Sequence, residues 1–250
     1  MNIALLQTDI RWADIESNHK AAEQSILSVK EGMDLFVLPE MWSTGFAVRP
    51  EGIAEEHDES LQWMKKMALQ TDAAIAGSVA VKLDGRYYNR FYFVKHDGEV
   101  ICYDKRHLFT YGGEAECYTA GTERVIVEWR GVRFLLQTCY DLRFPCFSRN
   151  AAPYYDCALY VANWPSSRRT VWDTLLRARA LENQCYVVGV NRVGNDAASQ
   201  YNGGSVFVSP YGKTIVQAQD DKAEVIVADI DLDKLQTFRK KFPVLEDRDR

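Results

Sequence analysis

The sequence has little of what nucleic-acid-binding, metal-binding and redox proteins need. Its formal net charge is −5, so it has no excess of Lys and Arg to hold a nucleic acid or a strongly anionic membrane. Its six cysteines and four histidines form no C-x-x-C pair and no set with the spacing of zinc ligands. We therefore expect no nucleic-acid, membrane or metal partner, and the composition favours a small-molecule ligand.

The N-terminus also lacks the features of a targeting segment. MNIALLQTDI has no basic stretch, and its apolar run is too short for a signal peptide or a membrane helix. The cysteines are scattered along the chain, and we interpret them as reduced thiols in a reducing compartment. A cytoplasmic location is the expectation.

No linker, internal repeat or low-complexity segment interrupts the chain. Its 250 residues, of which 47% are hydrophobic and 26% charged, have ordinary globular composition and suffice to bury a core. Short apolar runs typical of strands alternate with amphipathic helical patterns, which predicts an α/β protein. We expect one domain over residues 1–250.

Periodicity and turn signals place the individual elements. Strands are expected at 3–7, 34–39, 73–81, 88–95, 99–103, 125–129, 132–138, 156–162, 185–193, 205–209, 213–218 and 224–230. Helices are expected at 18–30, 59–70, 171–183 and 232–241, with a helix-like segment at 143–151 and a charged tail at 246–250. The residues expected to pack inward are Ala21, Ala22, Ser25, Ile26 and Val29 in the first helix and Leu175, Leu176, Ala178 and Leu181 in the helix at 171–183.

Two chemically capable side chains follow buried strands directly. Cys139 ends the apolar strand that closes at Thr138, and carboxyl ends of strands are where open α/β sheets place ligands. Glu40 ends the apolar strand at 34–39, where desolvation disfavours a charged carboxylate and suits a general base. Lys105 follows a hairpin. Taken singly, each has an ordinary explanation as a buried thiol, a solvated acid or a surface lysine.

Together these residues lie in segments that resemble a known family. LPEMWSTGF around Glu40, YDKRHLF around Lys105 and QTCYDLRFP around Cys139 resemble, in order, the signature segments of the nitrilase (carbon-nitrogen hydrolase) superfamily. YVANWP, RARALENQCYVVGVNRVG and GGSVFVSPYGK extend the resemblance over nearly the whole chain. YDKRHLF, CYDLRFP and the late KFP look most like the ω-amidase branch.

The resemblance implies a fold, a reaction and a set of roles. The fold is a four-layer αββα sandwich. Cys139 is the nucleophile, Glu40 the general base and Lys105 the cation that stabilises the oxyanion, with help from the backbone N–H of Tyr140. The family's second glutamate is Glu114, with Glu116 as the nearby competitor.

The implied chemistry is amide hydrolysis through a cysteine thioester, which splits one difficult step into two easier ones. No metal or organic cofactor is needed. For the ω-amidase branch the substrates are ω-amides of small 2-oxo dicarboxylic acids, such as 2-oxoglutaramate and 2-oxosuccinamate. The family also implies a homodimer or a larger homo-oligomer, with the helix at 171–183 and the C-terminal segment in its contacts.

A substrate with a free carboxylate needs a cationic partner, and arginines near the site are candidates. Arg168 follows the strand that ends at Asn163, Trp164 and Pro165, so Arg168 and Trp164 are expected to face the substrate. Arg143 is a further candidate, with a buried structural ion pair as its alternative. For Arg169 a plain surface position is equally consistent.

Three other functions stay open at this stage. One is a different nitrilase-superfamily enzyme, such as another amidase or an N-carbamoyl amino acid hydrolase. Another is a Cys-His protease-type site using His107, although a structural hydrogen-bonding role beside Lys105 suits His107 better. The last is a redox or binding thiol without enzymatic activity.

Overall fold

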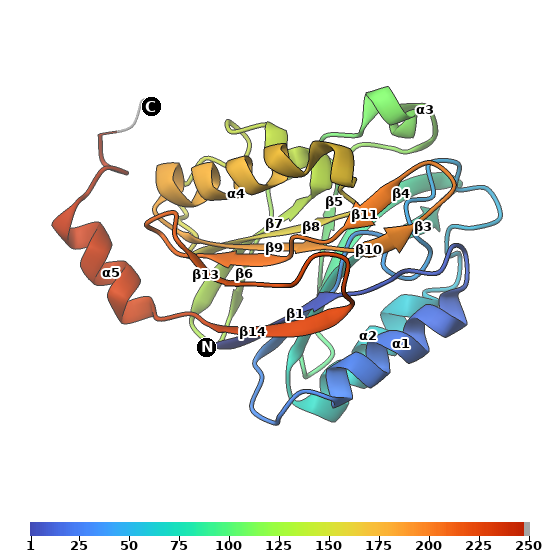
Figure 1. Ribbon diagram of the computed structural model, residues 1–250, viewed down its shortest axis with the longest axis horizontal. Coiled ribbons are helices and arrows are strands. Elements are labelled where there is room, and N and C mark those ends of the chain that lie inside the picture. The colour runs from blue at the N-terminus through green and yellow to red at the C-terminus, as the bar shows by residue number, and fades with distance from the viewer. Residues whose placement is uncertain (248–250) are drawn as a thin grey trace.

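The computed structural model describes residues 1–247, and these form two six-stranded sheets packed face to face between helices (Figure 1). One hydrophobic core lies between the sheets, where Phe93 of one sheet meets Phe134 of the other with ring centroids 5.9 Å apart. Each sheet also forms one hydrophobic core with the helices that cover its outer face. This arrangement confirms the four-layer αββα sandwich.

The first sheet has the strand order β14-β1-β2-β3-β4-β5, in which β1, β2 and β3 are parallel and the other pairs antiparallel. The second has the order β13-β12-β9-β8-β7-β6, in which β7, β8 and β9 are parallel. In each sheet the parallel strands deliver their carboxyl ends to one edge, as ligand sites require.

The strands of the first sheet are β1 (Asn2–Gln7), β2 (Leu35–Val37), β3 (Ala74–Leu83), β4 (Arg86–Val94), β5 (Val100–Asp104) and β14 (Glu224–Asp229). Those of the second are β6 (Ile126–Trp129), β7 (Val132–Thr138), β8 (Cys157–Ala162), β9 (Tyr186–Asn191), β12 (Val206–Val208) and β13 (Thr214–Gln217). A separate hairpin consists of β10 (Val193–Asn195) and β11 (Gln200–Asn202).

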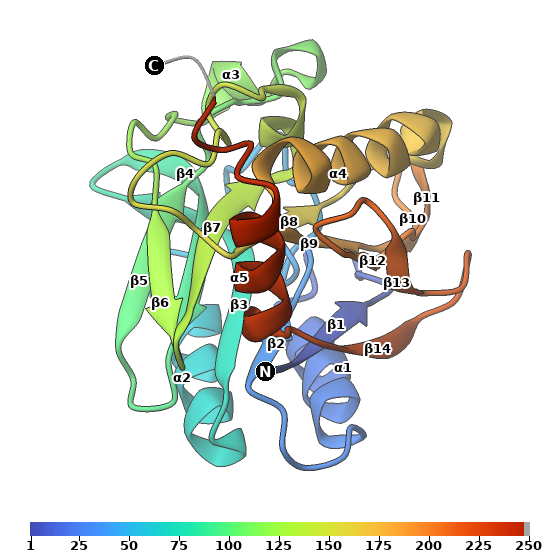
Figure 2. The ribbon, with the colours of Figure 1, turned by 90° about the vertical axis from the view of Figure 1, so that its left-hand side faces the viewer.

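The helices are α1 (Ile15–Leu27), α2 (Glu59–Thr71), α3 (Glu114–Cys117), α4 (Arg169–Asn183) and α5 (Leu232–Lys241). Figure 1 shows α1 and α2 on the outer face of the first sheet and α4 on the outer face of the second. In Figure 2, α5 crosses the end of the sandwich near the N-terminus. None of the helices among residues 1–247 is both long and apolar enough to cross a membrane.

The first helix begins earlier than predicted. Its start is at Ile15 because Asp14 caps it: the Asp14 carboxylate accepts a hydrogen bond from the Ser17 N–H at 3.0 Å. The buried face then consists of Asn18, Ala22 and Ile26, which recur every four residues. Inward packing of Ala21 was a wrong prediction, because Ala21 lies on the exposed side of this stripe.

Two predictions around the second sheet were also wrong. The helix-like segment at 143–151 is not helical. A 3-10 helix instead occupies Cys139–Arg143 and ends before Pro145, which disfavours helix in the residue preceding it. In α4, Leu181 is exposed and Arg179 is buried in its place, because the Arg179 guanidinium donates to the carbonyl oxygen of Leu142.

The remaining elements lie close to their predicted positions. The hairpin turn at Arg130 and Gly131 joins β6 to β7, and α5 has the predicted bounds. The predicted tail at 246–250 lies partly outside the described residues, which end at 247.

Candidate active site

The two sheets bring together side chains that are far apart in the sequence. Glu40 follows β2, Lys105 follows β5 and Cys139 follows β7, and all three meet at one edge of the sandwich. Asn163 joins them from the end of β8: its backbone N–H donates to Glu40 Oε2 at 2.8 Å, and its Nδ2 donates to the Glu40 carbonyl oxygen at 2.6 Å. Four strand ends from two sheets therefore share one site.

Lys105 lies at the centre of a buried polar network. Its Nζ donates to Glu40 Oε1 at 2.8 Å and to Glu114 Oε2 at 2.8 Å, and all three side chains are shielded from solvent. Burial alone would lower the pKa of Lys105, but the charges of Glu114 and Glu40 offset it and raise that pKa well above its usual value. Lys105 is thus a fixed cation between two carboxylates.

Asn89 completes this network, and we call Glu40, Asn89, Lys105 and Glu114 the buried charge cluster. Asn89 Nδ2 donates to Glu40 Oε1 at 2.8 Å and to Glu114 Oε1 at 3.1 Å. The sequence carried no signal for Asn89, since one polar residue within a strand is typical of a solvent-facing position.

The structure separates the two glutamates that competed for the second position. Glu114 is fully buried and also accepts the backbone N–H of Phe109 at 2.6 Å, whereas Glu116 is exposed. Burial raises the pKa of Glu114, an effect that the Lys105 charge opposes. Glu114 therefore belongs to the buried charge cluster, although its segment is polar in sequence.

Cys139 occupies a sharp turn between strand and 3-10 helix. Its φ is 45°, a left-handed backbone conformation that is uncommon for a residue with a side chain, and its side chain lines a pocket. Burial, followed by the charge of Glu40, raises the pKa of the Cys139 thiol well above its usual value, while Lys105 acts in the opposite direction. At neutral pH the sulfur is therefore a neutral thiol with Glu40 beside it.

Asp141 joins the turn that carries Cys139 to the segment that carries Lys105, a role that the sequence analysis missed. Its buried carboxylate accepts the Thr138 N–H at 2.9 Å and the Tyr103 hydroxyl at 2.7 Å. It also accepts the His107 N–H at 2.9 Å and contacts His107 Nδ1 at 2.8 Å. These partners flank both Cys139 and Lys105 in the chain.

His107 does not reach the thiol as a base in this arrangement. Its Nδ1 is engaged by Asp141, and its ring stacks on Phe144 with centroids 3.9 Å apart. Phe144 in turn contacts the ring of Tyr140 at 5.1 Å. His107 therefore has the structural hydrogen-bonding position expected for it, behind the wall of the site.

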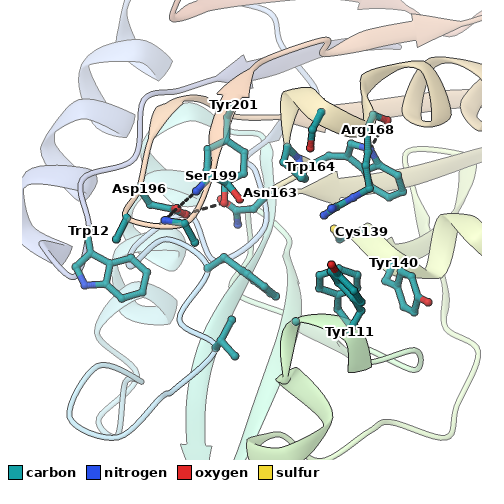
Figure 3. A pocket seen from close by; sticks show the side chains of 18 of the residues that line it. Trp12, Tyr111, Cys139, Tyr140, Asn163, Trp164, Arg168, Asp196, Ser199 and Tyr201 are labelled. Atoms are coloured by element: carbon teal, nitrogen blue, oxygen red, sulfur yellow. Dashed lines mark hydrogen bonds between the residues drawn. The ribbon is translucent and has the colours of Figure 1, made fainter.

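Cys139 opens into a pocket of about 900 Å³. In the view of Figure 3, Cys139 lies between Trp164 and Arg168 on one side and Tyr111 and Tyr140 on the other, with Trp12, Asp196 and Ser199 farther off. The lining residues are Trp12, Phe46, Val48, Arg49, Ile53, Phe109, Tyr111, Gly112, Cys139, Tyr140, Arg143, Asn163, Trp164, Pro165, Ser167, Arg168, Asp196, Ala197, Ala198, Ser199 and Tyr201.

Both arginines selected from the sequence face this pocket. The Arg143 guanidinium lies 5.4 Å from the ring centroid of Trp164, and that of Arg168 lies 5.2 Å from Phe109. Neither forms an ion pair with any residue in the described part of the chain, and Arg143 is exposed, so its alternative as a buried ion-pair partner was wrong. Arg169 lies outside the pocket lining and pairs with Asp173 and Asp220 at 2.8 and 2.9 Å.

Comparisons with known proteins agree with this geometry. The carbon-nitrogen hydrolase family matches residues 2–240. The chain is 45% identical to omega-amidase YafV of Yersinia enterocolitica, covering 100% of this chain and 97% of the relative. It is 35% identical to 2-oxoglutaramate amidase of Bacillus subtilis, covering 98% and 96%.

A solved structure shows the same fold. The CN-hydrolase superfamily protein XC1258 of Xanthomonas campestris, which carries an arsenic adduct in its active site, is 38% identical. It superposes with a TM-score of 0.96 over 100% of this chain and 97% of that one. The matched residues, the fold and the full-length identities lead to one conclusion: this chain belongs to the carbon-nitrogen hydrolase family of the nitrilase superfamily.

Proposed function

We propose that this protein is an ω-amidase that hydrolyses the ω-amide of small 2-oxo dicarboxylic acid monoamides, such as 2-oxoglutaramate, to the acid and ammonia. The observation that carries the proposal is the position of Cys139. Its thiol lies beside the buried charge cluster and opens into a pocket lined by arginines without ion-pair partners among residues 1–247. Full-length similarity to an omega-amidase and a 2-oxoglutaramate amidase supports it.

Charge balance explains why Glu40 is the proposed base. With Glu40 and Glu114 ionised and Lys105 protonated, the cluster carries one net negative charge. Loss of the thiol proton to solvent would give this desolvated site a second net negative charge. Transfer of that proton to Glu40 as the sulfur attacks the amide carbon leaves the total charge unchanged.

Attack on the carbonyl carbon forms a C–S bond and an oxyanion. Lys105 and the backbone N–H of Tyr140 are the proposed oxyanion donors, and removal of one such donor typically costs about 3–4 kcal/mol. The C–N bond then breaks, and Glu40 returns its proton to the departing ammonia. The product of this half-reaction is a thioester on Cys139.

Water completes the reaction. Glu40 accepts a proton from water as the oxygen attacks the thioester and returns it to the sulfur as the C–S bond breaks. The carboxylic acid formed then loses its remaining proton to solvent. Glu114 is the proposed positioning residue for this step, because it holds Lys105 through two bonds of 3.0 and 2.8 Å. The freed acid carries a new carboxylate beside Glu40 and Glu114, and like-charge repulsion favours its release.

The proposed contacts of the substrate explain its class. A carboxylate at the end opposite the amide meets Arg168 or Arg143, which can form paired hydrogen bonds to it. Trp164 lies under the Arg143 guanidinium and, with Tyr140, forms an apolar surface for the carbon chain.

The test is ammonia release from three substrates: 2-oxoglutaramate, an aliphatic monoamide and an N-carbamoyl amino acid. We expect 2-oxoglutaramate to have the highest kcat/KM. If it were the poorest of the three, the ω-amidase assignment would fail while membership of the family would stand.

We further propose that the protein forms a homodimer through α4 and α5. The exposed side chains Leu181, Tyr211 and Phe242 lie on α4, the β12–β13 turn and the end of α5. The rings of Tyr211 and Phe238 lie 4.1 Å apart, which makes this apolar surface continuous. A light-scattering mass of one chain would contradict the homodimer.

The single domain over 1–250 and the cytoplasmic location remain predictions.

A further inference from the structure

The pocket lining contains three arginines. Arg49, Arg143 and Arg168 line the pocket and have no ion-pair partner among residues 1–247. Outside the pocket some arginines form ion pairs, such as Arg90 with Asp104 at 2.7 Å and Arg239 with Asp156 at 3.0 Å, and others, such as Arg149, have no ion-pair partner among residues 1–247. Unpaired guanidinium groups converge on one pocket although the chain as a whole is acidic.

These arginines occupy two different walls. Arg143 and Arg168 share one wall, because Arg143 lies over Trp164 and Trp164 Nε1 donates to the Arg168 carbonyl oxygen at 2.9 Å. Arg49 comes from the loop after β2, together with Val48 and Ile53, which also line the pocket. A single carboxylate held by the first wall leaves Arg49 without a partner.

The acidic residue of the pocket lining, Asp196, is not an ion-pair partner of Arg49. The Asp196 carboxylate accepts the N–H groups of Ala198 and Ser199 at 2.8 and 2.7 Å and the Tyr201 hydroxyl at 2.7 Å (Figure 3). These bonds hold the turn between β10 and β11. Asp196 is therefore engaged by its own turn, and its interactions leave Arg49 available to a ligand.

The size of the pocket leads to the same inference. At about 900 Å³ it lies near the upper end of the range of about 300–1,000 Å³ that is usual for small-molecule sites. A five-carbon monoamide fills only part of such a space. Room and an unpaired cation on the second wall together indicate a longer, doubly anionic ligand.

We propose that Arg49 is a specificity-determining residue that binds a second anionic group of the substrate. The ligand class is a primary carboxamide whose acid part carries two carboxylates, one for the wall of Arg143 and Arg168 and one for Arg49. This inference rests on the proposed amidase function of the same pocket. Guanidinium binds carboxylate through two parallel hydrogen bonds, so geometry as well as charge selects the second group.

The test compares two substrates of equal chain length that differ only in the second carboxylate. N-butyrylglutamine and N-succinylglutamine share the side-chain amide and the α-carboxylate, and the acyl arm ends in a methyl group in the first and in a carboxylate in the second. We expect the native protein to favour N-succinylglutamine by about tenfold in kcat/KM, the size of a hydrogen bond to a charged group. Arg49→Ala should abolish this ratio, and Arg49→Glu should invert it.

Arg149→Ala is the matched control, because Arg149 is exposed and lies outside the pocket lining, so its ratio should equal that of the native protein. The proposal is overturned if Arg49→Ala keeps the native ratio. This includes the case in which both substrates lose the same factor in kcat/KM, because the ratio is then unchanged.

2-Oxoglutaramate, measured with every variant, separates this inference from the proposed function. If it is hydrolysed while neither glutamine derivative is, the second anion subsite is wrong and the ω-amidase proposal stands. If 2-oxoglutaramate is not hydrolysed while the kcat/KM ratio of the glutamine derivatives still depends on Arg49, the ω-amidase proposal is wrong and the second anion subsite stands.

Discussion

Charged side chains are paired with one another in the buried charge cluster and are unpaired at the arginines of the pocket lining. In the cluster, Lys105 meets two carboxylates within 3.0 Å, and all of these groups are shielded from solvent. In the pocket lining, Arg49 and Arg143 lie on different walls, are exposed and have no ion-pair partner among residues 1–247. Groups proposed for chemistry are fixed by the protein, whereas groups proposed for recognition keep their donors for a ligand.

This difference has an energetic basis. Buried charges are expensive to desolvate, so each must be paired, and removing one partner leaves the others uncompensated. Guanidinium groups in contact with solvent pay no desolvation cost, so they are stable without an ion-pair partner. Changes in the cluster should therefore lower kcat and stability, and changes on the wall should raise KM.

Among changes in the buried charge cluster, Glu40→Gln should cause the largest loss of activity. It removes the proton acceptor for Cys139, and general bases contribute about 10²–10⁴-fold, so we expect kcat for ammonia release to fall by about 10³-fold or more. Steady-state kinetics on 2-oxoglutaramate measures this. Native activity in the variant would show that Glu40 is not the general base of the reaction.

Glu114→Gln and Glu116→Gln form a matched pair on one short helix. Glu114 holds Lys105, so its loss should lower kcat by about 10²-fold, the size of one misplaced electrostatic donor. Glu116 is exposed, so its variant should keep native kinetics. Equal activities in the two variants would contradict the assignment of Glu114 to the catalytic machinery.

The sequence predicted the cluster better than the wall. Cys139 and Glu40 follow strands that are mainly apolar, and such strand ends can be recognised without a structure. The α/β class followed from periodicity, whereas the αββα layers followed only from the family resemblance. Asn89 was missed, because pairing between sheet neighbours decides which way a strand residue faces.

The pocket position of Arg49 and the buried face of α4 could not be predicted from residue spacing, because both depend on tertiary contacts. Arg49 lies in a loop without periodicity, so nothing marked it as a pocket residue. Arg179 replaces Leu181 on the buried face of α4 because the carbonyl of Leu142 provides a hydrogen-bond acceptor there. A local pattern predicts an amphipathic helix but not the polar partner that a neighbouring turn offers.

Asp141→Asn tests whether the cluster depends on its support. The variant keeps the shape but replaces one acceptor oxygen with an NH₂ group, which opposes the N–H donors of Thr138 or His107. We expect kcat to fall by about 10–100-fold with little change in KM, because displacement of Lys105 or Cys139 affects the chemical step. A rise in KM alone, with native kcat, would show that Asp141 does not position these groups.

Arg168→Ala tests the wall side, with the smallest expected effect on kcat. Loss of one charge-assisted contact to the substrate carboxylate should raise KM for 2-oxoglutaramate by about tenfold while kcat stays within about twofold. Arg149→Ala is again the control, because it removes the same charge from outside the pocket. If Arg168→Ala keeps the native KM, the carboxylate binds elsewhere, and Arg143 becomes the next residue to replace. If kcat falls as far as in Glu114→Gln, the division between a fixed catalytic cluster and a free recognition wall is wrong, because Arg168 would then act on the transition state rather than on binding alone.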